Sequence, residues 1–160
     1  VSGHDFKMIF DKRSGSLDLA KDLGADLTIN SGEKDVVQVL KDHSDGVGPD
    51  IVIDAAGGMD TARLSVEAVR SGGKVILVAI YTNTPNFDFN SIVSKEVEIL
   101  GSLGYNKYDL NEAIRLISLG SVKTKPLVSD VIGLEEVIDV GFARMLNPDK
   151  DFFRILVSPR

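Results

Sequence analysis

The sequence predicts an α/β fold, a Rossmann-like doubly wound parallel sheet in three layers. Short β-branched or aromatic runs alternate with helical patterns of about ten residues, as in successive βαβ units. The run at residues 75–80 is apolar throughout, which is typical of a strand covered on both faces. A chain of 160 residues, 43% of them hydrophobic, is long enough for one ordinary core.

Each expected element carries a start or stop signal. Ser31 and Asp60 are the expected helix caps, and a turn is expected at residues 46–49. Glycines at positions 24, 72, 73 and 120 are the expected helix stops. The expected strands cover residues 6–10, 27–29, 51–53, 75–80, 97–100, 127–132 and 152–157. The expected helices cover residues 16–23, 109–119 and 134–146, with others after Ser31, after Asp60 and near Ser91.

The sheet is expected to lack its first strand and the glycine fingerprint. The G-x-G-x-x-G fingerprint of dinucleotide folds lies about 20 residues before the ribose-binding acid, but only ten residues precede Asp11. Gly46 and Gly48 are followed by Pro49 rather than by a helix. Because the first strand is central in the order 3-2-1-4-5-6, its absence leaves two strands with unpaired backbone groups. Together with the start at Val1, this indicates a fragment, or a sheet completed by a neighbouring chain.

Composition and charge argue against several classes of function. The net charge is −6 and the basic residues are scattered, so nucleic acid is not an expected partner. No apolar stretch approaches the roughly 20 residues of a membrane span, and no signal peptide is visible, so we expect a cytoplasmic protein. The chain has no cysteine, and His4 and His43 have no partner at metal-ligand spacing, so we expect no zinc centre within it.

Asp11 is the candidate ligand of a cofactor ribose, because it directly follows the strand expected at residues 6–10. A carboxylate there accepts hydrogen bonds from the ribose hydroxyls and repels a 2'-phosphate, which favours NAD over NADP. Lys12 and Arg13 are near enough in sequence to approach a phosphate, so NADP stays open. A plainer interpretation, that Asp11 caps the turn at residues 14–16, is equally open.

Two other pairs of residues each have a functional and a structural interpretation. Asp50 and Asp54 flank an apolar strand, where strand-end caps and turn bonding are favoured over a functional carboxylate pair. Tyr81 and Tyr105 lie beside the expected cofactor groove, where binding and simple packing both stay open.

The chain resembles the cofactor-binding domain of zinc-dependent medium-chain dehydrogenases, the family of alcohol, polyol, butanediol and threonine dehydrogenases. The resemblance covers nearly the whole chain, and the order and spacing of its motifs are specific. The motifs are FDKRSGSLDLAKDLGADLTIN (10–30), DIVIDAAGG (50–58), SGGKVILVAI (71–80), KEVEILGSLGY (95–105), and AIRLISLG with the later KPLV (113–128).

The resemblance implies a set of cofactor-binding residues, with Asp11 as the ribose acid. It places a groove-lining turn at residues 55–57, a carboxamide-binding segment at 78–80 and a nicotinamide-facing segment at 102–103. Family members often carry glycine where this chain has Ala79, which puts the local backbone geometry in question. An arginine near the pyrophosphate is also implied, although a plain surface position is favoured for it. The implied residues are Asp11, Ala55, Ala56, Gly57, Val78, Ala79, Ile80, Ser102, Leu103 and Arg154.

The implied activity is hydride transfer between a secondary alcohol or polyol and the nicotinamide of NAD. In the family, zinc is held by a catalytic domain that this chain lacks, so the chain alone is expected to be inactive and to hold no catalytic residue. Residues 1–125 are the expected NAD(P)-binding domain, and residues 126–160 a segment that packs on the catalytic domain and exposes apolar surface without it.

Two other functions stay open for this fold. One is a non-catalytic nucleotide-binding or regulatory module, and the other is an interaction protein whose sheet is completed by a partner strand. The expected partners of the dehydrogenase are a small alcohol and further copies of the chain. Homo-oligomer contacts are expected at the strand 97–100 and the loop 81–89.

Overall fold

Parallel strands form three separate sheets in this computed structural model, which describes residues 6–147 and 152–159. The first sheet pairs β1 with β2, the second has the order β3-β4-β5, and the third pairs β6 with β7. The strands are β1 (Met8–Asp11), β2 (Leu27–Asn30), β3 (Ile51–Asp54), β4 (Lys74–Leu77), β5 (Glu98–Gly101), β6 (Val128–Gly133) and β7 (Arg154–Ser158).

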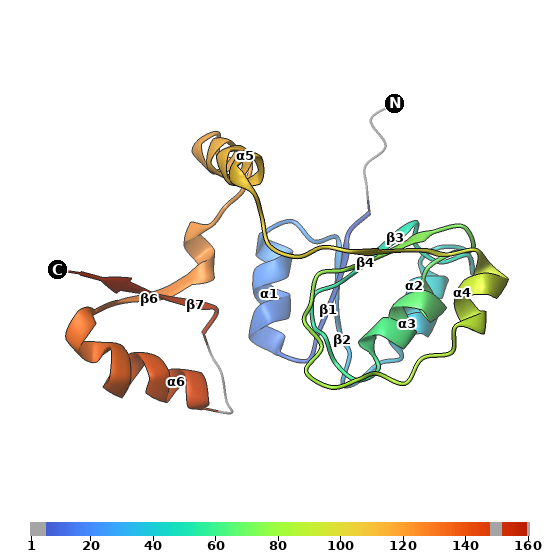
Figure 1. Cartoon of the computed structure of the whole chain (residues 1–160), viewed down its shortest axis with the longest axis horizontal. Coiled ribbons are helices and arrows are strands. Elements are labelled where there is room, and N and C mark those ends of the chain that lie inside the picture. The colour runs from blue at the N-terminus through green and yellow to red at the C-terminus, as the bar shows by residue number, and fades with distance from the viewer. Residues whose placement is uncertain (1–5, 148–151, 160) are drawn as a thin grey trace.

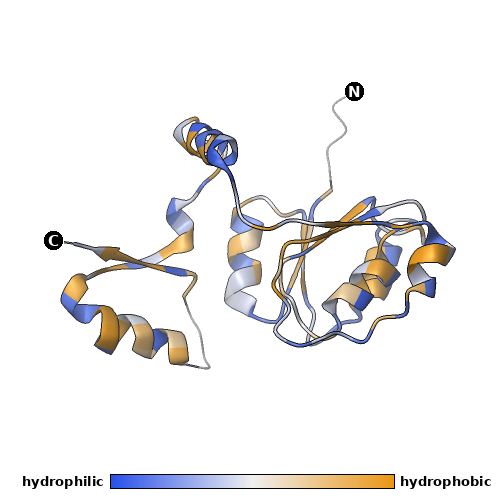
Figure 2. Ribbon diagram, in the orientation of Figure 1, coloured by the Kyte–Doolittle hydropathy of each residue, from blue (hydrophilic) through white to orange (hydrophobic). Residues whose placement is uncertain are grey.

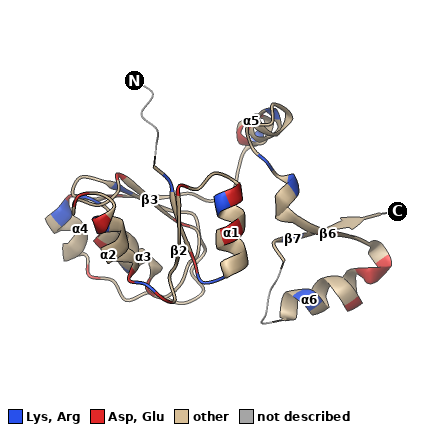
Figure 3. Cartoon of the chain, turned by 180° about the vertical axis from the view of Figure 1, so that it is seen from behind, with Lys and Arg blue, Asp and Glu red and all other residues tan. Residues whose placement is uncertain are grey.

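Helices alternate with these strands and make the fold Rossmann-like, as the sequence predicts. Helix α1 packs on β1 and β2, whereas α2, α3 and α4 lie on the other side of the strands (Figure 1). The three layers are also seen from behind in Figure 3. The helices are α1 (Ser14–Asp22), α2 (Val36–Asp42), α3 (Thr61–Ala68), α4 (Asn90–Lys95), α5 (Lys107–Ser118) and α6 (Ala143–Leu146).

The facing edges of β1 and β3 are not paired with each other in the described parts of the chain. β1 bonds to β2 and β3 bonds to β4, so each of the two strands has one edge without a ladder. In the described residues, these two strands thus have the unpaired backbone groups that the sequence predicts for them.

The core of the second sheet is built from small β-branched residues. Val66 and Val69 from the α3 region pack against Val75 of β4 and Val97 before β5, and all four are buried. The other face of the sheet is open, because Ile51 and Ile53 of β3 are each more than half exposed. The strand run at residues 75–80 was expected to be covered on both faces. Within it Val75 is buried and Ile76 and Leu77 are half-buried, whereas Val78 and Ile80, beyond the end of β4, are exposed.

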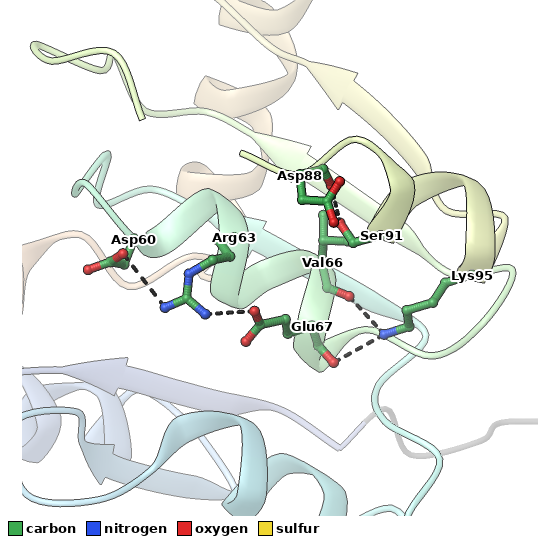
Figure 4. Close-up of polar contacts among 7 residues, drawn as sticks. All are labelled: Asp60, Arg63, Val66, Glu67, Asp88, Ser91 and Lys95. Carbon is green, nitrogen blue, oxygen red and sulfur yellow. Dashed lines mark hydrogen bonds and ion pairs between the residues drawn. The ribbon is translucent and has the colours of Figure 1, made fainter. Parts of the chain in front are cut away.

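Lys95 ties the end of α4 to the end of α3 (Figure 4). Its Nζ donates to the carbonyl oxygens of Val66 at 2.8 Å and Glu67 at 3.1 Å, and also to that of Val69. The last carbonyls of a helix have no partner within the helix, so an ammonium group there satisfies them and complements the helix dipole.

Two helix caps differ from the sequence prediction. Asp35 rather than Ser31 caps α2, because its carboxylate accepts the Gln38 N–H at 3.1 Å and the helix begins only at Val36. Asp60 precedes α3 as expected, but its side chain makes no capping bond and instead lies 3.6 Å from the Arg63 guanidinium (Figure 4).

Two element ends also differ from the prediction. Helix α3 ends at Ala68, before the glycines at 72 and 73, because extended backbone at Val69 already stops it. Strand β4 ends at Leu77 rather than at residue 80. The N–H groups of Val78 and Ala79 both donate to the Asp54 carbonyl, at 2.9 and 3.1 Å, which bends the chain out of the ladder.

The turn expected at residues 46–49 lies slightly earlier, where the Val47 N–H donates to the Ser44 carbonyl oxygen at 2.9 Å. Gly46 and Gly48 both have positive φ angles, 81° and 98°. A Cβ added at Gly48 would clash with the Ala68 carbonyl oxygen, so the α3 backbone can approach only a glycine here.

In the C-terminal segment, β6 and β7 pair with each other in the third sheet. A 3-10 turn (Leu134–Glu136), a π-helical turn (Val137–Phe142) and α6 follow one another, where a single helix over 134–146 was predicted. The predicted exposed apolar surface is present, and Figure 2 shows these helical turns rich in hydrophobic residues. The exposed apolar side chains include Leu134, Ile138, Phe142, Met145, Leu146, Leu156 and Val157.

Candidate functional site

Three of the predicted cofactor-binding segments meet at the carboxyl edge of the second sheet. Residues 55–57 follow β3, residues 78–80 follow β4, and residues 102–103 follow β5. The strands are parallel, so all three segments leave the sheet at one edge. The Ser102 N–H donates to the Leu77 carbonyl at 2.9 Å, which joins the last segment to the end of β4.

Gly57 brings the first segment into close approach with the second. Its φ is +64°, and a Cβ added there would lie 3.0 Å from the Ala79 Cβ and 3.0 Å from the Ile80 carbonyl oxygen. Both the backbone angle and the lack of space require glycine. Ala79 itself is not among the described non-glycine residues with positive φ, so its backbone does not need the glycine that family members often carry.

The edge formed by these segments presents apolar side chains to solvent. Val78 is 45% exposed, Ile80 76% and Leu103 84%. Ala55, Ala56 and Ser102 are exposed as well, whereas Gly57 and Ala79 are half-buried. Small residues next to exposed apolar ones form a surface on which a flat ring can lie while backbone groups hydrogen-bond its substituents.

A buried carboxylate, that of Asp54, supports this edge from below. Asp54 is 4% exposed, and its Oδ1 accepts the N–H groups of Ala56 at 2.9 Å and Gly57 at 3.2 Å. Its Oδ2 accepts the Thr61 hydroxyl at 2.5 Å and the Tyr81 hydroxyl. Burial alone would raise the pKa of Asp54, but these hydrogen bonds outweigh it and lower the pKa below its usual value.

The favoured interpretation of Asp50 and Asp54, turn bonding, is confirmed for Asp54. Asp50 has a different partner, the Arg70 guanidinium, whose Nε lies 2.7 Å from it. With an 81% exposed side chain, Asp50 is a surface ion-pair partner and not the second member of a carboxylate pair.

Tyr81 and Thr61 complete the cluster around Asp54. The pKa of Tyr81 is raised to about 12, mainly by burial and next by its hydrogen bond to the Asp54 carboxylate. The hydroxyl therefore stays a neutral donor. Through this hydrogen bond, Tyr81 packs onto the turn that follows β3. Sequence reasoning did not single out Thr61, although a hydroxyl at the first residue of the helix after a strand-end aspartate was the available signal.

Asp11 stands at the carboxyl end of β1 and is held by Arg13. It accepts the Arg13 N–H at 2.9 Å and faces the guanidinium, with Nε and Nη2 at 3.5 and 3.4 Å. Burial tends to raise the pKa of Asp11, but the bonds and the charge of Arg13 lower it overall. The carboxylate therefore bonds the turn that follows β1 through Arg13, and the Ser16 hydroxyl also contributes to the lowered pKa of Asp11.

Arg154 lies apart from the other predicted residues, exposed at the start of β7. It lines a hollow of 270 Å³ together with Thr124, Leu127, Val128 and Phe153. The Arg13 guanidinium lies 6.0 Å from the centre of the Phe153 ring, so the residue next to Arg154 reaches the turn that carries Asp11.

The remaining sequence candidates make no site in the described residues. Tyr105 is 80% exposed, which argues against packing. His43 is exposed, as expected, with Nδ1 2.8 Å from the Val39 carbonyl oxygen, and His4 lies outside the described residues.

Within residues 6–147 and 152–159 no group of three metal-ligating side chains occurs. No helix in this part is both long and apolar enough to cross a membrane. Basic residues are scattered over several elements (Figure 3).

Comparison with known sequences finds dehydrogenases. A family model described as zinc-binding dehydrogenase matches residues 7–118. The chain is 32% identical over 126 residues to D-arabitol-phosphate dehydrogenase of Enterococcus avium, covering 78% of this chain and 36% of that protein. It is 27% identical over 143 residues to (R,R)-butanediol dehydrogenase of Neisseria gonorrhoeae, covering 89% and 40%. The chain thus spans well under half the length of these relatives.

Comparison with solved structures agrees on the fold. The 2R,3R-butanediol dehydrogenase of Bacillus subtilis has a TM-score of 0.85 at 23% identity, over 96% of this chain and 43% of that one. A protein of Sinorhizobium meliloti described as a zinc-binding dehydrogenase, bound to NADP, has a TM-score of 0.83 at 25% identity, over 95% and 44%.

Proposed function

Because the chain belongs to the zinc-binding dehydrogenase family, we propose that it is the cofactor-binding part of an NAD-dependent oxidoreductase acting on a secondary alcohol or polyol. The observation that carries the proposal is the meeting of residues 55–57, 78–80 and 102–103 at one sheet edge. Asp11 stands at the same, carboxyl, end of its own strand. Doubly wound folds bind dinucleotides at these strand ends.

Asp11 and the three segments at this edge each have a chemical role toward NAD. The Asp11 carboxylate accepts hydrogen bonds from the adenosine ribose, in place of its long contacts to Arg13. The exposed apolar side chains of Val78, Ile80 and Leu103 hold the nicotinamide ring, and the backbone of residues 78–80 bonds its carboxamide. The bound cofactor supplies the acceptor or donor of hydride, and the chain's residues orient it and keep water from its face.

The preference for NAD over NADP rests on the charge of Asp11, which repels a 2'-phosphate. Arg13 lies against that charge and offsets part of it. The Sinorhizobium relative is bound to NADP, so NADP is the competing cofactor in the test.

Zinc is assigned no role in this chain. The described residues offer no group of three ligands and the sequence has no cysteine, so the zinc of the family does not fit here. We propose that the chain alone does not turn over an alcohol, and that its division at residue 125, its association into homo-oligomers and its cytoplasmic location follow the family pattern.

The test uses the complete product of the gene that encodes this chain. NADH and NADPH are titrated by nucleotide fluorescence, and NAD reduction is assayed with secondary alcohols and polyols. We expect saturable NADH binding that Asp11→Asn weakens about tenfold, the loss of one charge-assisted hydrogen bond. Asp18→Asn, at an exposed position of α1, is the matched control. Absence of NADH binding would refute the proposal, and binding without turnover would favour the non-catalytic nucleotide-binding module.

A further inference from the structure

Asp54 contacts both strand-end segments through different groups. Its side chain accepts the N–H groups of Ala56 and Gly57, in the turn after β3. Its carbonyl oxygen accepts those of Val78 and Ala79, in the segment after β4. Four backbone N–H groups of the proposed cofactor edge are therefore bonded to one residue.

The Asp54 carboxylate is itself held by two hydroxyl groups from either side. Thr61 begins α3, and its hydroxyl donates to Oδ2 at 2.5 Å while also lying 3.1 Å from the Gly58 carbonyl oxygen. Tyr81 follows the segment after β4 and donates to the same Oδ2. The carboxylate thus bridges the first turn of α3 and the chain that leaves β4.

The hydrogen bonds of the cluster all run in one direction, from its neighbours to the Asp54 carboxylate. A buried carboxylate is an acceptor only, and at 4% exposure water cannot replace its partners. Its neighbours supply four donors, two backbone N–H groups and two hydroxyls, which match its two oxygens. An amide in its place would turn one oxygen into a donor facing other donors.

We propose that Asp54 is a positioning residue for cofactor binding, which holds residues 55–57 and 78–80 at the separation that the dinucleotide requires, with Thr61 and Tyr81 orienting its carboxylate. This inference rests on the proposed function. Asp54 does not touch the cofactor itself; it sets the place of backbone groups and of the Gly57 turn that do.

The test compares Asp54→Asn with Asp35→Asn in the complete gene product. Asp35 also accepts a backbone N–H, but it caps α2 away from the edge. We expect Asp54→Asn to raise the NADH dissociation constant about tenfold to a hundredfold at a temperature where the variant stays folded, and Asp35→Asn to leave it unchanged. Equal NADH affinity of folded Asp54→Asn and the unchanged protein would overturn the proposal.

A second comparison uses the hydroxyl groups. Thr61→Ser keeps the donor to Asp54 and Thr61→Val removes it at nearly the same volume. We expect Thr61→Val and Tyr81→Phe each to weaken NADH binding about threefold to tenfold, and Thr61→Ser to retain it. If Thr61→Ser weakens binding as much as Thr61→Val does, the hydroxyl is not what orients the carboxylate and the proposal fails.

Amide hydrogen exchange separates this inference from the proposed function, because it needs no nucleotide. In Asp54→Asn we expect faster exchange confined to Ala56 and Gly57, whose N–H groups bond the side chain, with Val78, Ala79 and the α3 core unchanged because the backbone carbonyl of residue 54 is kept. Local acceleration without NADH binding in the unchanged protein would keep the positioning geometry but refute the cofactor. Uniform acceleration across the second sheet would show a general structural role and overturn the inference.

Discussion

The Arg13 guanidinium lies 3.4 Å from the carboxylate of Asp11, on the turn that follows β1. Both side chains are partly exposed, 48% and 30%, so solvent screens the pair and its contribution to stability is small. The pair matters instead for recognition, because it places a positive and a negative group where a nucleotide ribose is expected.

Arg13→Ala is predicted to sharpen the preference for NADH over NADPH. Without the guanidinium, the Asp11 charge repels a 2'-phosphate fully, and we expect the ratio of the two dissociation constants to rise about tenfold. Fluorescence titrations with both nucleotides measure the ratio. Arg63→Ala, which removes an arginine paired with Glu67 on α3, is the control with an unchanged ratio. A ratio that stays constant in Arg13→Ala would show that this residue does not face the 2'-position.

Gly57→Ala is predicted to destabilise the fold by about 2 kcal/mol, since a left-handed φ costs an alanine about 1 kcal/mol or more and the new methyl group is crowded by Ala79. Urea unfolding monitored by circular dichroism measures the change. Gly15→Ala is the matched control, because Gly15 lies within α1 with free space around it. We expect that control to gain about 0.5 kcal/mol, as glycine is a poor helix former. Equal stability of the two variants would contradict the geometry at Gly57.

Tyr81 is predicted to make stability fall at alkaline pH. Its pKa is raised from 10.0 to about 12 in the folded protein, so the unfolded chain loses this proton first as pH rises. The stabilising contribution is therefore complete below pH 10 and is lost progressively toward pH 12. Urea midpoints at pH 9 and pH 11 measure it.

Tyr81→Phe should lack this part of the alkaline decline, because phenylalanine has no proton to lose. Tyr108→Phe, at an 83% exposed position of α5, should keep it. If the decline persists unchanged in Tyr81→Phe, another group is responsible for it.

Lys95→Met is predicted to cost about 2 kcal/mol, because three carbonyl groups at the end of α3 lose a charged donor. Lys74→Met is the matched control: it removes a lysine whose ion pair with Glu98, 3.0 Å long, is exposed on both sides. We expect that control to change stability by less than about 1 kcal/mol. Thermal unfolding of both variants measures these changes. Similar losses of stability in the two variants would argue against the capping of the α3 C-terminus by Lys95 in Figure 4.

The sequence was most informative where periodicity and composition act locally. The alternation of short apolar runs with helical patterns predicted every described strand to within a few residues, because buried strands and amphipathic helices need these patterns. Strand ends were harder. β4 stops at Leu77 because the Asp54 carbonyl binds two successive N–H groups, a contact between residues 24 and 25 positions apart that no local pattern encodes.

Some residues of the candidate site were predicted from the sequence, and others were not. The positions of Asp11 and of residues 55–57 and 78–80 at strand ends were foreseen from the resemblance and from strand order. The role of Asp54 was foreseen only as turn bonding. Its partner Thr61 was missed, because a lone threonine at a helix start has many equally good local uses.

The amino-acid sequence by itself determined the βαβ order and the parallel sheets, since hydrophobic patterning requires them. Only the tertiary structure decided that Asp54 joins the segments after β3 and β4, through its carboxylate and its carbonyl oxygen, and that Phe153 reaches Arg13. Contacts between residues far apart in the chain depend on how elements pack, and packing is a property of the whole assembly of side chains rather than of any segment.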